Sequence, residues 1–197
     1  MTPGDSGLRT DSKDTSQQHE GEYWEPSGIV TTMWVSLSIV LGVLAFLLLG
    51  LLYTLLGRLP ENESEILNWP AIAGLTVTML VVHQLIHVAV ARSIGGSPRV
   101  NVDVVQLIFP VIYCRIAGQR FSRTGFLVYL LTPLALPTVV GVMIMPVDER
   151  MVWMIIPLTA NAALSLRDLW MAWVVWMLPN GSSVKAERDG LQIFRPT

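Results

Sequence analysis

The feature that most constrains this chain is a run of 30 residues without a charged side chain, from Gly28 to Gly57. A helix needs about 20 apolar residues to cross the hydrocarbon core of a bilayer, and this run exceeds that length. Over the whole chain 52% of the residues are hydrophobic and 14% are charged, whereas about a quarter are charged in an average soluble domain. These proportions exclude a soluble globular protein and predict an integral membrane protein.

Three further apolar segments follow, at about 69–91, 126–147 and 151–178. Prolines interrupt the last two, and membrane helices tolerate prolines, which kink them. The predicted fold class is therefore all-α and integral to the membrane, with about four transmembrane helices.

The segment between the second and third spans has a different pattern. From Val100 to Val104 valines alternate with polar residues, which is the period of a β-strand. The apolar stretch that follows is too short to span a bilayer and is broken by Pro110. We expect a short β-hairpin within 97–120, at the membrane surface and resting on the helices, because strand edges are not tolerated in bare lipid.

The two ends of the chain are more polar than its centre. Residues 1–26 carry six acids and two bases and few aliphatic side chains, so we expect a disordered acidic tail. The membrane domain is then 27–180, and 181–197 forms a C-terminal tail. Basic residues are concentrated in the two tails and in the hairpin segment, so the positive-inside rule places both termini and the hairpin in the cytoplasm.

Net charge and cysteine content exclude further classes. The formal net charge of −2 argues against nucleic-acid binding through positive charge. A single cysteine, Cys114, excludes an internal disulfide and a metal cluster held by cysteines alone. We interpret Cys114 as a small apolar residue rather than a metal ligand.

Two histidines, His83 and His87, lie in the second span. Residues four apart share one face of a helix, so both imidazoles can reach one metal ion. The alternative is that each histidine hydrogen-bonds to a neighbouring helix. Because ionisable groups inside a membrane are costly and usually functional, the pair favours a site.

A second polar cluster lies in the fourth span, where Asn161, Ser165 and Asp168 follow spacings of four and three and share one helical face. The neighbouring Arg167 points about 100° away from Asp168 and is poorly placed to neutralise it. We expect Arg167 to extend to the cytoplasmic headgroups or to cap another polar group.

The two clusters are predicted to lie at the same depth. His83 and His87 come 14 and 18 residues after Trp69, and Asp168 comes 17 residues after Met151. Trp69 and Met151 begin their spans on the same side of the membrane. With a rise of about 1.5 Å per residue, the three side chains reach similar depth in the cytoplasmic half. Two histidines and one carboxylate with one open position are typical of catalytic zinc.

The motifs HQLIH (83–87) and NAALSLRD (161–168) resemble the HExxH and N-x-x-x-S-x-x-D motifs of the putative zincin peptidases. These are small bacterial and archaeal membrane proteins, similar in layout to site-2-type intramembrane proteases. The resemblance covers about 28–195, including the hairpin and three short motifs in the same order. These motifs are Tyr113-Cys114, Phe121-Ser122-Arg123 and Asp189-Gly190.

The resemblance implies a zinc metalloprotease of a prokaryotic plasma membrane that cleaves a peptide or a membrane protein near the cytoplasmic face. It implies His83, His87 and Asp168 as ligands of Zn²⁺. Asn161 and Ser165 would support the ligands or orient the substrate.

Gln84 stands where the HExxH motif has glutamate. In the usual mechanism that glutamate takes a proton from zinc-activated water and passes it to the leaving amine. An amide has nearly the same size but no useful basicity near neutral pH. We therefore expect zinc binding with reduced or absent hydrolysis, in either a natural inactive relative or a chain with a Glu-to-Gln substitution.

Two other classes of function stay open at this point. One is a non-catalytic metal-binding membrane protein, a pseudoprotease that holds a client helix. The other is a small proton or metal-ion transporter that uses four residues as a relay. These residues are His83, His87, Arg167 and Asp168.

Overall fold

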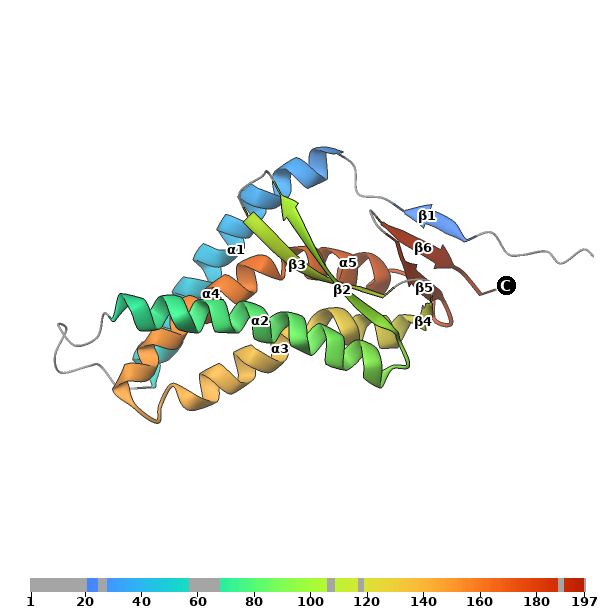
Figure 1. Ribbon diagram of the computed structural model, residues 1–197. Coiled ribbons are helices and arrows are strands. Elements are labelled where there is room, and N and C mark those ends of the chain that lie inside the picture. Colours follow the sequence, from blue (N-terminus) through green and yellow to red (C-terminus); the bar gives the residue numbers. More distant parts are fainter. Residues whose placement is uncertain are drawn as a thin grey trace, which may run out of the picture.

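Figure 1 shows a computed structural model of the chain, which is mostly helical. The structure describes residues 21–24, 28–56, 68–105, 109–116, 119–187 and 190–196. The long helices are α1 (Gly28–Leu55), α2 (Trp69–Ser93) and α3 (Arg123–Ile144). A short 3-10 helix η2 (Glu149–Met154) leads into α4 (Ile155–Leu164) and α5 (Leu166–Trp176).

Local signals in the sequence explain where two of the long helices begin. Before α2, the side chain of Asn68 accepts a hydrogen bond from the N–H of Ala71 at 3.2 Å. Before α3, the Oγ of Ser122 accepts one from the N–H of Gly125 at 3.1 Å. Such N-caps satisfy N–H groups that the first helical turn leaves unpaired.

Three helices are long and apolar enough to cross a membrane, which indicates membrane association. They comprise Met33–Leu55 of α1 with a mean hydropathy of 2.8, α2 with 1.7 and α3 with 2.1. The sequence predicted corresponding spans at 28–57, 69–91 and 126–147. Large side chains of α1 are mostly exposed, as expected of a surface that faces lipid.

The fourth predicted span is not one continuous helix. Residues 151–178 instead contain the end of η2 followed by α4 and α5, which meet at Ser165. There the Oγ of Ser165 donates to the carbonyl of Asn161 at 2.7 Å, and the backbone N–H of Ser165 is shared between the carbonyls of Asn161 at 3.0 Å and Ala162 at 3.2 Å. The structure therefore has three helices that could cross a membrane among its described residues, and the predicted fourth transmembrane helix is not confirmed.

A β-hairpin follows α2, within the range where the sequence predicts one. Strands β2 (Pro98–Val105) and β3 (Phe109–Ile116) pair antiparallel, from Pro98 opposite Ile116 to Val105 opposite Phe109. The backbone of Cys114 pairs with that of Val100. The hairpin runs close to α2, and its position at a membrane surface stays a prediction.

A second sheet, which the sequence did not predict, joins both ends of the chain. Its order is β1 (Glu22–Trp24), β6 (Leu191–Phe194), β5 (Ser183–Ala186) and β4 (Arg120–Ser122), and all neighbours are antiparallel. The interpretation of 1–26 as a disordered tail is therefore wrong for Glu22–Trp24. Residues 1–20 and Asp189 lie outside the described residues.

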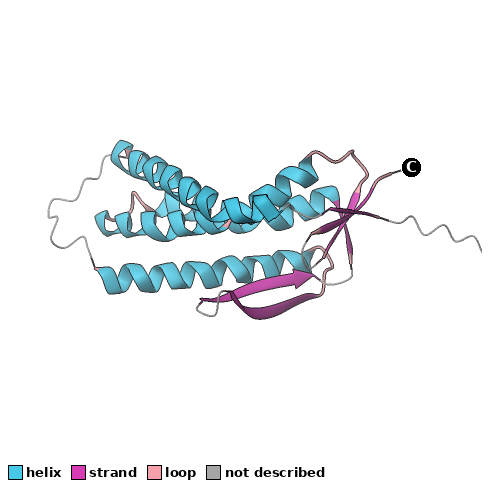
Figure 2. Cartoon of the chain, turned by 90° about the horizontal axis from the view of Figure 1, so that it is seen from above, coloured by secondary structure: helices cyan, strands magenta, loops and turns pink. Residues whose placement is uncertain are grey.

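The four-stranded sheet covers one end of the helices (Figure 2). Helices α1 and α3 begin at this end, and α2 and α5 finish there, as their connections to strands require. A buried core ties the sheet to the bundle through side chains of α3, α5, β5 and β6, among them Phe126, Val175, Val184 and Leu191. The N-terminal strand β1 and the C-terminal strands β5 and β6 thus lie at the same end of the bundle.

Close packing between α3 and α4 generates a test of this bundle. A Cβ atom added at Gly141 would lie 2.6 Å from Cδ1 of the buried Leu158, whereas one added at Gly50 of α1 would meet nothing within 4 Å. Overpacking of a core costs about 1–3 kcal/mol, while alanine stabilises an open helical position by about 0.5–1 kcal/mol. We expect Gly141→Ala to lower the thermal midpoint in detergent and Gly50→Ala to maintain or raise it. Equal midpoints for the two variants would contradict the α3–α4 contact.

Candidate metal centre

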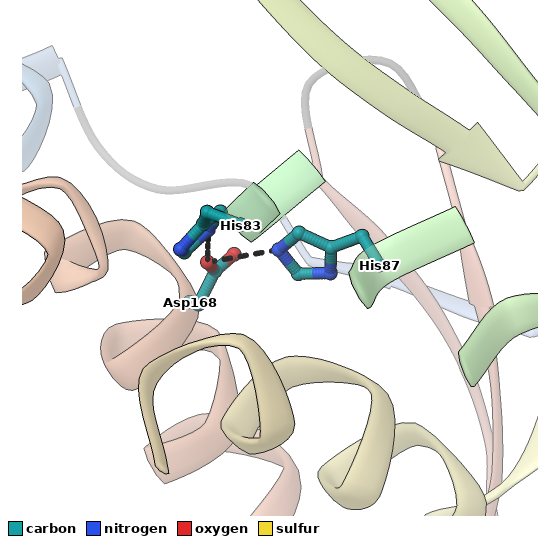
Figure 3. Close-up of side chains that lie close together, drawn as sticks. All are labelled: His83, His87 and Asp168. Atoms are coloured by element: carbon teal, nitrogen blue, oxygen red, sulfur yellow. Dashed lines mark hydrogen bonds and ion pairs between the residues drawn. The ribbon is translucent and has the colours of Figure 1, made fainter. Parts of the chain in front are cut away.

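Two helices bring three metal-binding side chains together (Figure 3). His83 and His87 project from one face of α2, and both point to the same oxygen of Asp168 in the first turn of α5. The Nε2 atom of His83 lies 3.5 Å from Oδ2 of Asp168, and Nε2 of His87 lies 3.3 Å from it. Each histidine is 5% exposed. The predicted convergence of these residues is therefore observed.

Two of the separations among these atoms are close to those of a tetrahedral zinc site. Ligand bonds of about 2.0–2.1 Å imply about 3.4 Å between neighbouring ligands of a tetrahedron, close to the two histidine–Asp168 distances. The donor atoms of the three residues all lie within 4.8 Å of one another. Two imidazole nitrogens and one carboxylate also match the ligand types of catalytic zinc, which leaves one coordination position open. His83, His87 and Asp168 can thus hold a metal ion.

His83 is oriented by a neighbour outside this ligand set. Its Nδ1 lies 2.8 Å from Oδ1 of Asn161 in α4, and Nδ2 of Asn161 donates to the carbonyl of Pro133 in α3 at 3.2 Å. Asn161 is fully buried. Such a hydrogen bond to the second ring nitrogen fixes the orientation and tautomer of a metal-binding histidine, which leaves Nε2 of His83 for the metal.

His87 is positioned by packing instead. Its ring lies 4.7 Å from the ring of Tyr129 in α3 and 5.0 Å from the ring of His83, measured between centroids. Its Nδ1 is buried and has no hydrogen-bond partner among the described residues. The two imidazoles of the site therefore differ, because the ring nitrogen remote from Asp168 is bonded in one and unbonded in the other.

Ser165 lies at the junction of α4 and α5 and is fully buried. Its hydroxyl donates to the backbone carbonyl of Asn161, and among the described residues it forms no hydrogen bond with the three candidate ligands. The backbone of Ser165 nevertheless continues the chain into the turn of α5 that carries Asp168. Its observed role is therefore to shape the connection between two site elements.

Arg167 is exposed and does not pair with Asp168. Its Cζ lies 5.9 Å from the ring of Trp34 in α1, and no carboxylate of the described residues lies within ion-pair distance of it. The ion pairs of Asp168 within this part of the chain are those with His83 and His87. A buried carboxylate in this setting is compensated by protonated imidazoles or by a bound cation.

Gln84 follows His83 on α2 and is half-buried. Its amide forms no hydrogen bond with any other described residue.

Sequence reasoning missed two residues next to the site, Tyr129 and Pro133. Tyr129 is one of many apolar or aromatic residues in its helix, so its packing on His87 has no distinct signal. Pro133 contributes a backbone carbonyl, which any residue type carries. Both residues belong to α3, a helix that supplies none of the three candidate ligands.

Comparison with known protein families agrees with this arrangement. A family model described as putative zincin peptidase matches residues 76–183, more than half of the chain. The chain belongs to the putative zincin peptidase family. The matched range contains all three candidate ligands as well as Asn161 and Gln84. No curated protein and no solved structure matched the chain.

Membership in the zincin peptidase family points to a metalloprotease-like role and to zinc as the metal.

The neighbours Asp168 and Arg167 allow a test of the ligand set, because only Asp168 faces the two histidines. We expect Asp168→Asn to abolish stoichiometric zinc binding, because it removes the charged ligand, and Arg167→Gln to retain it. Zinc content of the purified variants, measured by elemental analysis, checks this. Equal loss in both variants would contradict the assignment of Asp168.

Proposed function

We propose that the chain is a zinc-binding membrane protein of the zincin peptidase family in which peptide hydrolysis is weakened or lost. The convergence of His83, His87 and Asp168 on one point, with nitrogen–oxygen distances of 3.3 and 3.5 Å, carries this proposal. The ligands come from two helices, and His87 and Asp168 are 81 positions apart in the sequence, so the folded bundle is needed to create the site.

The expected chemistry follows from the ligand set. A zinc ion held there would supply Lewis-acid activation of water and of a peptide carbonyl. His83 and His87 supply neutral ring nitrogens, and Asp168 supplies negative charge that favours the divalent cation. The substrate class is a peptide segment of a membrane protein or another unfolded polypeptide.

Gln84 determines how far this chemistry can proceed. In HExxH enzymes the residue at this position is the general base. A carboxamide can donate or accept a hydrogen bond, but it cannot take up the proton that the reaction releases near neutral pH. Gln84 is therefore suited to binding a peptide group and unsuited to proton transfer. The site as a whole supports retention of a polypeptide segment better than rapid cleavage.

We place this activity at the membrane. The three long apolar helices would span the bilayer, with α4 and α5 packed against them, and lipid is the expected partner of their exposed faces. The basic residues of the tails and hairpin favour a cytoplasmic location for the two tails and the hairpin. The relay of a transporter gains no support, since Arg167 lies against Trp34 and not against Asp168.

Zinc content is the first test of this proposal. The purified chain is expected to contain about one zinc per molecule, and His87→Ala is expected to lose it. Elemental analysis after dialysis provides the measurement. A metal-free wild-type chain, after supply of zinc during purification, would overturn the proposed function.

Replacement of the missing base is the second test. Gln84→Glu restores a carboxylate of the same size, so we expect hydrolysis of casein or of a membrane-protein substrate to rise by about 100-fold or more, the lower range for general base catalysis. Gln84→Met serves as the size-matched control and should stay at the wild-type level. His87→Ala added to Gln84→Glu should abolish the gain. A zinc-loaded Gln84→Glu chain without activity would favour the client-holding function over an impaired protease.

A further inference from the structure

The hydrogen bond from Asn161 to the carbonyl of Pro133 has a specific cause in the sequence of α3. In an α-helix the carbonyl of residue i accepts the N–H of residue i+4. The residue four positions after Pro133 is Pro137, which has no N–H. The ring of a proline also forces the carbonyl four residues earlier away from its regular direction. The Pro133 carbonyl is thus left without a helical donor and accepts from Nδ2 of Asn161 at 3.2 Å.

This carbonyl fixes the direction of the hydrogen bonds that lead to the metal centre. A carbonyl oxygen can only accept, so the amide group of Asn161 that faces Pro133 must be Nδ2. Oδ1 then faces His83, and since it is also an acceptor, the ring atom Nδ1 at 2.8 Å must carry the proton. In the neutral imidazole, which is the form that binds a metal, the lone pair of His83 is consequently on Nε2, the atom 3.5 Å from Asp168.

We propose that Pro137 is a positioning residue of the metal centre. By leaving the Pro133 carbonyl without a donor, it fixes the amide of Asn161 and, through Asn161, the metal-binding tautomer of His83. This inference rests on the proposed function as a zinc-binding protein. Pro137, Asn161 and His83 belong to α3, α4 and α2, so three helices contribute to the state of one ligand.

The alternative role of a proline in a membrane helix is to bend it. Pro133 and Pro137 are both buried in α3, one turn apart, so each can bend the helix. They differ in what they do to the site. Pro137→Ala adds an N–H that can bond to the carbonyl of residue 133, whereas Pro133→Ala keeps that carbonyl and adds its N–H one turn earlier. Pro133→Ala is therefore a matched control for helix shape.

The experiment measures the zinc dissociation constant of the full-length chain in detergent by competition with a chelator. We expect Pro137→Ala to weaken zinc binding about 10-fold or more, within the range for supports of metal ligands. Pro133→Ala leaves the carbonyl of residue 133 without a helical donor and should therefore weaken binding less than Pro137→Ala does. Asn161→Ala should weaken binding too, and Pro137→Ala added to it should cause no further loss, because no amide is left to orient.

A tautomer measurement keeps this inference separate from the proposed function. In the metal-free chain, nitrogen NMR shifts of His83 should report a proton on Nδ1, and Pro137→Ala should shift the population toward a proton on Nε2. Unchanged shifts and unchanged zinc affinity in Pro137→Ala would overturn the inference. An equal loss in Pro133→Ala, or a full additional loss in the Asn161→Ala background, would assign the effect to helix shape. A wild-type chain that binds no zinc would overturn the proposed function alone, and the NMR result would still decide the role of Pro137.

Discussion

The structure around the candidate site depends on the electrostatic demand of Asp168. A carboxylate among apolar helices is strongly destabilising unless a positive or hydrogen-bonding partner faces it. His83 and His87 meet this demand from α2, and a divalent cation would meet it more fully. Because the partners come from different helices, the contact also constrains the rotation and depth of α2 relative to α5. The site and the packing of the bundle are therefore parts of one arrangement.

The convergence of the three candidate ligands could be predicted from the sequence because they are exceptions to an apolar background. Charged and imidazole side chains are rare within the spans, and regular helical rise converts their spacing into depth. The orientation of Asn161 could not be obtained in this way. It depends on the backbone carbonyl of Pro133, and every residue type carries such a carbonyl. The sequence indicates that a helical carbonyl lacks its donor only where a proline follows four positions later.

The elements of the fold likewise include some that the sequence predicts and some that it does not. Long uninterrupted hydropathy predicted α1, α2 and α3 closely, and alternation predicted the β2–β3 hairpin. The interruption at Ser165 was missed since hydropathy continues through it while the hydrogen bonding changes. The four-stranded sheet was missed because its strands have three or four residues each and find their partners far along the chain.

That sheet has a consequence for the order of folding. Strand β1 precedes every helix and strand β6 follows them, yet they are neighbours. During synthesis, β1 emerges first and must remain unpaired while the helices are made, because contacts between distant parts of a chain form late. Closure of the sheet then requires the last described strand. A chain released before β6 would hold all three candidate ligands, but β1 and β5 would lack the strand that lies between them.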